Sequence, residues 1–255
     1  MPAFDETPAT TALCDARNAT PRVVFVSGYR RKALENYHAL NTVARACAQA
    51  NLNCTTISFD TIPAGKYKKQ PPFSEMVRRS AAVLNGDPRP SVLLGHCGGG
   101  AVALEASKHV DPDLLLGVVF LCPPLAVPGR VSFLKKSGLN WLRKNVFASA
   151  DFRDAAANKA TYLAVTKEVF GRMTQTELRC FPNDGVVLVG ATGDKIYSAE
   201  ATKRLAGSLG VSYRSIQDGH SPKQEESAHE LADILASLIH NGRDFNRTSA
   251  PALHS

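Results

Sequence analysis

The 255-residue sequence lacks several features that define other classes of protein. It has no run of about 18 uncharged apolar residues, which a membrane-spanning helix requires, so we expect no membrane span. Its first residues, MPAFDETPAT, contain neither the basic n-region nor the apolar h-region of a secretory signal. We therefore expect a cytoplasmic protein.

The sequence also has none of the common patterns that bind metals or cofactors. Its six cysteines form no Cys-x-x-Cys pair and have no spacing to histidine that suits zinc. A phosphate-binding P-loop and a dinucleotide-binding glycine motif are both missing. We expect free thiols, no bound metal and no resident cofactor. The cysteines stand at positions 14, 47, 54, 97, 122 and 180.

Basic residues outnumber acidic ones, and the formal net charge is +7. The basic residues stand in small groups, and aromatic residues do not alternate with them as they do in surfaces that stack nucleobases. The charge permits an acidic partner. We expect no nucleic-acid ligand.

Short apolar segments alternate with amphipathic segments between residues 21 and 240. This alternation is typical of βαβ units, in which helices cover both faces of a parallel sheet. We predict one α/β domain over 21–240, with a mostly parallel sheet of about six strands. Residues 1–20 and 241–255 are predicted to be disordered tails. The predicted strands are 22–28, 53–59, 91–97, 114–122, 185–191 and 211–217, and the predicted helices are 33–50, 98–110, 198–210 and 223–240.

One region, about 125–182, interrupts this alternation. It contains no evident strand, and its helix-like segments carry apolar and aromatic residues such as Trp141, Tyr162 and Phe170. An insertion of this length between two core strands is often a lid over a binding site. We predict a helical lid here. The alternative is that the same residues pack onto one edge of the core.

The motif Gly95-His96-Cys97-Gly98-Gly99 follows an apolar strand and precedes a predicted helix. It matches the nucleophile elbow, in which the nucleophile stands on a strained turn between a strand and a helix. Glycines at 95 and 99 remove side chains that would collide with the neighbouring strand and helix. Cys97 is therefore the predicted nucleophile, with the N–H of Gly98 as an oxyanion donor. We expect His96 to pack beside the elbow.

With this elbow, the chain from Arg22 to His240 resembles the α/β-hydrolase superfamily. In that family the acid follows the strand after the lid, and the histidine follows the last strand. The resemblance implies that Asp194 and His220, which stand after the fifth and sixth predicted strands, complete a catalytic triad with Cys97. Asp218 is the main competitor for the acid, but it lies only two residues before the histidine, which is poor geometry for orienting the ring.

The superfamily takes its second oxyanion donor from the loop after an early strand. That place holds Gly28 and Tyr29 in this chain. Gly28 would let a substrate approach the backbone, and Tyr29 would present its N–H. The family's usual His-Gly is replaced by Ser-Gly here, so this assignment rests on location alone.

Most members of the superfamily have serine at the elbow, whereas this chain has cysteine. A free thiol has a pKa of about 8.5, so Cys97 would form a thiolate–imidazolium pair with His220 more readily than serine would form an alkoxide. A thiolate is a better leaving group than an alkoxide or an amine, and its attack on esters and amides therefore tends to reverse. We expect substrates whose own leaving group is a thiol or another stabilised anion.

Four functions are consistent with this chemistry. The first is a biosynthetic thioesterase or acyltransferase that forms an acyl-cysteine from coenzyme A thioesters or from an acidic acyl carrier protein. The second is an enol-lactone hydrolase similar to dienelactone hydrolase, which also uses Cys, His and Asp. The third is a cyclase; the family's cyclases place the acid after the strand that follows the elbow, where this chain has Cys122. The fourth is a non-catalytic receptor or scaffold.

Overall fold

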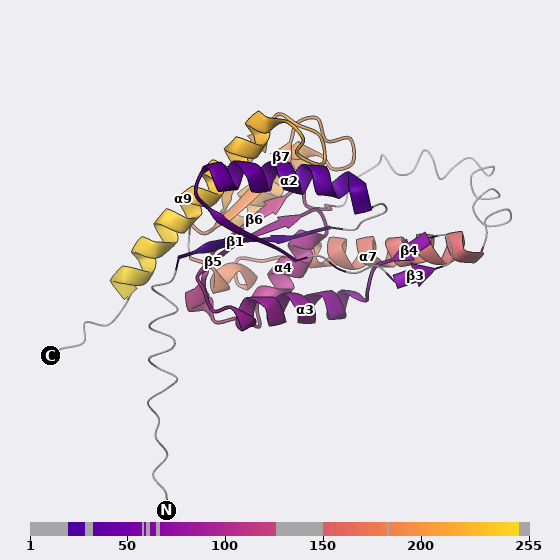
Figure 1. Ribbon diagram of the computed structural model, residues 1–255, viewed down its shortest axis with the longest axis horizontal. Coiled ribbons are helices and arrows are strands. Elements are labelled where there is room, and N and C mark those ends of the chain that lie inside the picture. Colours follow the sequence, from indigo (N-terminus) through magenta and orange to yellow (C-terminus); the bar gives the residue numbers. More distant parts are fainter. Residues whose placement is uncertain are drawn as a thin grey trace, which may run out of the picture.

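The computed structural model describes residues 20–28, 33–57, 59, 62–64, 67–125, 150–182 and 184–249. Within them, six parallel strands form one sheet in the order β2-β1-β5-β6-β7-β8 (Figure 1). Each strand lies within a predicted one, and the predicted α/β fold is confirmed. The strands are β1 (Arg22–Val26), β2 (Asn53–Ile57), β5 (Ser91–His96), β6 (Leu115–Leu121), β7 (Val186–Ala191) and β8 (Ser212–Ile216).

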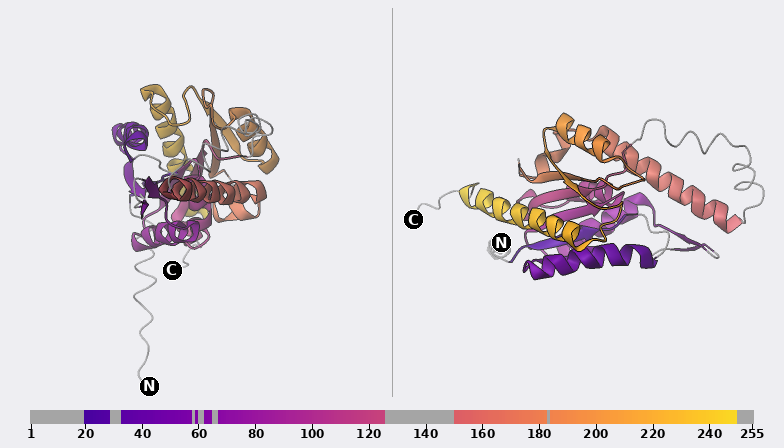
Figure 2. Two further views of the ribbon diagram at one scale, coloured as in Figure 1. Left: turned by 90° about the vertical axis from the view of Figure 1, so that its right-hand side faces the viewer. Right: turned by 90° about the horizontal axis from the view of Figure 1, so that it is seen from above.

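Helices cover both faces of the sheet, which explains why β1, β5, β6 and β7 are buried along their whole length. No helix among the described residues is long and apolar enough to cross a bilayer. Helices α2 (Ala33–Gln49) and α9 (Glu225–Ser249) cover one face, and α3 (Phe73–Gly86), α4 (Gly99–Ser107), α8 (Ala199–Leu209) and the second half of α7 (Ala150–Arg172) cover the other (Figures 1 and 2).

Helix α7 is the main described part of the predicted lid region, whereas 126–149 lie outside the described residues. The first half of α7 extends beyond the sheet beside the hairpin of β3 (Ile62–Ala64) and β4 (Tyr67–Lys69) (Figure 1). The backbone N–H of Gln70 donates to Asn158 Oδ1 at 2.9 Å, and Asn158 Nδ2 donates to the Gln70 carbonyl at 3.2 Å. The hairpin thus supports the part of α7 that the sheet does not.

The second half of α7 is packed into the core. Tyr162 and Phe170 are buried, as is Met173 directly after the helix, and the ring of Phe170 meets that of Phe120 edge to face at 5.5 Å. The alternative interpretation of this region, core packing, therefore holds for these residues. The same packing fixes Tyr162 above the start of α4, which matters for the site described below.

The C-terminal helix runs further than the sequence suggests. Sequence analysis ends it at His240, but α9 continues to Ser249, so the predicted tail of 241–255 begins too early. An Asn-Gly pair is typical of a helix end, yet Gly242 lies where α9 crosses β6. A Cβ atom at Gly242 would be 2.9 Å from the Cβ of Leu116. The glycine allows this close approach, and the helix continues past it.

Candidate active site

The predicted nucleophile, acid and histidine follow strands β5, β7 and β8. Because all strands of the sheet are parallel, their carboxyl ends lie along one edge. The structure accordingly brings Cys97, Asp194 and His220 together, although more than 120 residues separate the first from the last.

Cys97 has a left-handed backbone conformation, with φ of 55°. A non-glycine residue in this region carries strain of about 1–3 kcal/mol and is held there by its surroundings. The Cys97 N–H donates to the Leu121 carbonyl at 2.8 Å, and helix α4 begins two residues later. The side chain is almost buried. These are the features of the nucleophile elbow that the motif predicts.

Glycines on both sides of Cys97 permit this turn. A Cβ atom at Gly95 would overlap with the backbone of Gly100, and one at Gly99 would overlap with the carbonyl oxygen of Val26. The strand and the helix therefore approach each other at backbone distance, which no side chain would permit.

We expect Gly99→Ala to lower the free energy of unfolding by about 3 kcal/mol, since the added methyl group must displace backbone of β1. Gly171→Ala is the matched control, because nothing lies within 4 Å of a Cβ atom there. Removing a helical glycine at that position stabilises by about 0.5–1 kcal/mol. Urea unfolding of both variants measures the two effects, and equal midpoints would contradict the close approach at the elbow.

Asp194 holds the ring of His220. Its Oδ2 accepts a hydrogen bond from His220 Nδ1 at 2.8 Å, and its Oδ1 accepts from the backbone N–H groups of Ile196 and Tyr197 at 2.6 and 3.0 Å. Burial alone would raise the pKa of Asp194, but the bonds from His220 and the backbone lower it. The carboxylate is thus ionised and fixes the orientation of the imidazole.

His220 in turn lies beside the thiols of Cys122 and Cys97. Burial alone would lower the pKa of His220, but the hydrogen bond with Asp194 and the interactions with the two thiols outweigh it and raise the pKa to about 12. The ring is therefore held as the imidazolium, which is the form that stabilises a neighbouring thiolate.

Sequence analysis assigns no role to Cys122, yet this thiol belongs to the site. It follows β6, whose last residue Leu121 is paired in register with His96, so Cys122 stands beside Cys97. Its backbone is also left-handed, with φ of 48°. The only signal in the sequence is this position, directly after the strand next to the elbow.

The donor atoms of Cys122, Asp194 and His220 lie within 4.8 Å of one another. Among the described residues, these three could hold a metal ion, since thiolate, carboxylate and imidazole are all zinc ligands. The hydrogen bond between His220 and Asp194 also accounts for the closeness of these two residues.

His96 contacts His220. Its Nε2–H donates to the carbonyl oxygen of His220 at 2.7 Å, and the two ring centroids are 4.9 Å apart. Burial and the nearby charge of His220 lower the pKa of His96 to about 4. His96 is therefore neutral and packs beside the elbow, as its position in the motif predicts.

The two histidines should titrate in opposite directions from their ordinary value of about 6.5. We expect the His220 ring to remain protonated from pH 6.5 to above pH 10 and the His96 ring to remain neutral above about pH 5. A raised pKa stabilises the fold fully below pH 6.5, and this contribution declines as pH rises toward the folded pKa. Imidazole NMR shifts of both rings test this; titration of His220 near pH 6.5 would contradict it.

Asp218, the competing acid, has a different role. Its Oδ1 accepts from the Gly219 N–H at 2.7 Å, and its Oδ2 accepts from the N–H groups of Lys223 and Gln224 at 2.7 and 2.9 Å. Both carboxylate oxygens are thus engaged with backbone. Asp218 shapes the loop that carries His220, whereas Asp194 contacts the ring.

Of the residues predicted to form the oxyanion site, the structure describes Gly28 and Gly98. A Cβ atom at Gly28 would be 2.8 Å from the His96 carbonyl oxygen, 3.0 Å from the Cys97 Cβ and 3.5 Å from the Gly98 nitrogen. The backbone at Gly28 therefore packs directly against the elbow, where a larger residue would collide with the His96 carbonyl oxygen. Tyr29, the predicted second donor, lies outside the described residues.

Two tyrosines for which the sequence predicts no role in the site lie close to Cys97. Tyr197, in the loop after β7, lies beside Cys97, and its ring centroid is 5.3 Å from that of His220. Tyr162 of α7 lies against Gly98, the residue after Cys97. Both side chains are buried. The surroundings of Cys97 therefore include two buried phenol side chains.

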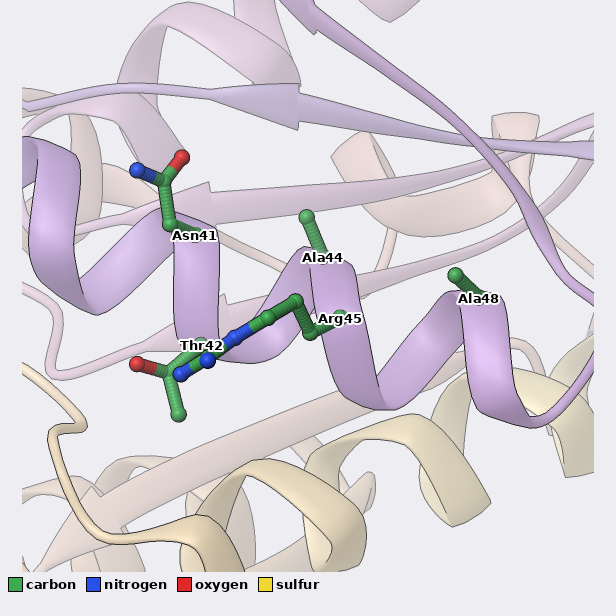
Figure 3. A pocket seen from close by; sticks show the side chains of 5 residues that line it. All are labelled: Asn41, Thr42, Ala44, Arg45 and Ala48. Atoms are coloured by element: carbon green, nitrogen blue, oxygen red, sulfur yellow. The ribbon is translucent and has the colours of Figure 1, made fainter.

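A surface hollow lies on helix α2, away from the candidate site. It has a volume of about 500 Å³ and is lined by residues of α2 alone (Figure 3). None of the residues that line it belongs to the elbow or to the loops after β7 and β8. A depression lined by one helix does not enclose a ligand, so we do not assign it to the active site. Its lining residues are Asn41, Thr42, Ala44, Arg45 and Ala48.

A parallel sheet with a strained cysteine after one strand and a histidine–aspartate pair after two others has the architecture of an α/β hydrolase. A model of this family, described as the alpha/beta hydrolase family, matches residues 23–234. The match spans most of the sequence, and the chain belongs to the α/β-hydrolase family. No curated protein matches it in sequence.

Solved structures share the fold at low sequence identity. An α/β hydrolase enzyme from the metagenome of sediments of the Mar Chica lagoon has 16% identity and a TM-score of 0.55, over 90% of this chain and 94% of its own. The esterase domain of a Rhodothermus marinus protein has 15% identity and a TM-score of 0.53, over 85% of each chain. The ydeN gene product of B. subtilis has 12% identity and a TM-score of 0.56, over 87% and 100%. At these identities the likeness establishes the fold alone.

Proposed function

We propose that the protein is a thioesterase or acyltransferase that works through an acyl-cysteine at Cys97. The observation that carries this proposal is the position of Cys97, which stands on the strained turn after β5 and beside the imidazolium of His220. A thiolate–imidazolium pair at a strained turn is the arrangement that activates a cysteine nucleophile. Asp194 has the role of orienting and stabilising that imidazolium.

Acylation begins when the Cys97 thiolate attacks the carbonyl carbon of the substrate. The C=O electron pair moves to the oxygen, which the N–H of Gly98 and the dipole of α4 stabilise. When the intermediate collapses, the C–S bond to the leaving group breaks. The leaving thiolate takes the proton of His220, and Cys97 holds the acyl group.

Deacylation reverses these roles. The ring of His220, now neutral, removes a proton from water or from an acceptor amine, alcohol or thiol. The oxygen, nitrogen or sulfur of that nucleophile attacks the acyl carbon, and the bond to Cys97 breaks. Thiolate and imidazolium are both restored, so the cycle balances without a cofactor. Hydrolysis and transfer differ only in which nucleophile reaches the site.

Thioesters are the favoured substrates because of the competition between leaving groups. In the intermediate, the Cys97 sulfur competes with the group that the substrate must lose. If the substrate would lose an alkoxide, the thiolate of Cys97 leaves first and the intermediate returns to the starting ester. If the substrate would lose another thiolate, the two groups leave with similar ease. Coenzyme A and acyl carrier proteins present thioesters of this kind. The net charge of +7 favours an acidic carrier through long-range attraction.

The test is a panel of short acyl-CoA thioesters matched with the corresponding ethyl esters and enol-lactones. Intact mass and free thiol release are recorded together. We expect acyl adducts on the protein from thioesters, at rates at least about tenfold above those from the matched esters. Adding amines or alcohols then separates transfer from hydrolysis, because a transferase passes the acyl group to them.

Other outcomes point to the other functions. Faster reaction with enol-lactones than with thioesters would favour the dienelactone-hydrolase-like alternative. Release of a product that has lost the thiol but gained no water or acceptor would indicate a cyclase. No adduct with any substrate, together with slow alkylation by iodoacetamide, would contradict an activated Cys97 and leave the scaffold.

A further inference from the structure

Tyr162 places a phenol hydroxyl beside the predicted oxyanion donor. A Cβ atom built on Gly98 would be 2.5 Å from the hydroxyl oxygen of Tyr162 and 2.8 Å from its Cζ. The hydroxyl therefore lies directly over the backbone of Gly98, the residue after the nucleophile. Tyr162 belongs to α7 (Ala150–Arg172), which is far in sequence from the elbow between β5 and α4.

The hydroxyl of Tyr162 lies in a water-excluded part of the site, since the residue is only 4% exposed. Burial raises the pKa of Tyr162 well above its ordinary value, and the nearby Cys97 adds to this. The side chain therefore stays a neutral phenol, which can donate a hydrogen bond.

A tetrahedral intermediate on Cys97 needs more than one donor. Its oxyanion forms next to the N–H of Gly98, the residue against which Tyr162 packs, and such sites gain most from donors that are already in place before the reaction. We propose that Tyr162 is a catalytic residue whose hydroxyl donates to the oxyanion, so that α7 completes the oxyanion hole of the elbow. This proposal rests on the acyl-cysteine route proposed above.

The ring of Tyr162, which is buried against Gly98, could instead obstruct the substrate, and its removal would then raise the rate of acylation. Tyr162→Phe distinguishes the two roles, because it removes the donor and keeps the ring. Tyr213→Phe is the matched control: Tyr213 donates its hydroxyl to the Ala199 carbonyl at 3.3 Å and is remote from the elbow in sequence.

The experiment compares two reactions of the same thiol. Single-turnover acylation by the acyl-CoA that reacts best with the wild type passes through an oxyanion, whereas alkylation by iodoacetamide is a direct displacement and forms none. We expect Tyr162→Phe to slow acylation about 10²-fold and to leave alkylation within about twofold of the wild type. Tyr213→Phe should change neither rate.

Each result decides the matter. Equal acylation rates in Tyr162→Phe and wild type would overturn the proposal, as would faster acylation, which indicates an obstructing ring. A parallel loss of acylation and alkylation would show that Tyr162 only maintains the elbow, and would overturn it too. If wild type forms no adduct at Cys97, the acyl-cysteine route fails first and this inference falls with it.

Discussion

Cys97→Ala is expected to abolish the acyl adduct and to lower thioester turnover by at least about 10⁴-fold, because it removes the sulfur on which the proposed covalent intermediate forms. The substitution removes only the sulfur, and the turn already accommodates a Cβ atom at this position. The fold should therefore survive, and intact mass after exposure to acyl-CoA measures the effect directly.

Cys122→Ala is the decisive comparison, because the Cys122 thiol lies within 4.8 Å of a ring nitrogen of the same histidine. We expect this variant still to form the adduct, on Cys97, at a rate lowered by about tenfold or less. The reverse pattern, with the adduct retained in Cys97→Ala and lost in Cys122→Ala, would transfer the role of nucleophile to Cys122. Peptide mapping of the modified wild-type protein identifies the thiol independently.

Asp194→Asn is expected to lower turnover on the order of 10³-fold. The amide NH₂ would face His220 Nδ1, which can then no longer donate, and the ring would lose both its orientation and its positive charge. The amide oxygen can still accept from the N–H groups of Ile196 and Tyr197, so the loop after β7 should keep its shape. Turnover and the alkylation rate of Cys97 are measured in parallel, and both should fall.

Asp218→Ala provides the contrast. It leaves up to three backbone N–H groups without their acceptor, and we expect the free energy of unfolding to fall by about 1–3 kcal/mol. Turnover per folded molecule should stay within about tenfold of the wild type. If Asp218→Ala instead lost as much activity as Asp194→Asn at full stability, the assignment of the acid would be wrong.

Local features of the sequence determined most of the scaffold. Apolar runs predict β1, β5, β6 and β7, since a strand covered on both faces has no solvent-facing positions to alternate. The edge strands β2 and β8 are exposed at most positions, and their place in the alternation with helices indicates them. The elbow is likewise readable, because Gly95 and Gly99 mark a backbone approach that only glycine allows. Strand order in the chain then predicts that Asp194 and His220 lie at the same edge as Cys97. All of these signals depend on near neighbours in the sequence.

The tertiary structure decided which side chains meet at that edge. Cys122 follows β6, Tyr197 stands in the same loop as Asp194, and Tyr162 belongs to α7; no motif in the sequence marks any of the three as part of the site. Gly242 shows the same limit: it suggests a helix end, but contact with Leu116 across the molecule explains it. The sequence by itself determined the sheet, the elbow and the candidate triad; only packing between distant elements could place a second thiol and two phenols around Cys97, because such contacts depend on the positions of whole helices and strands.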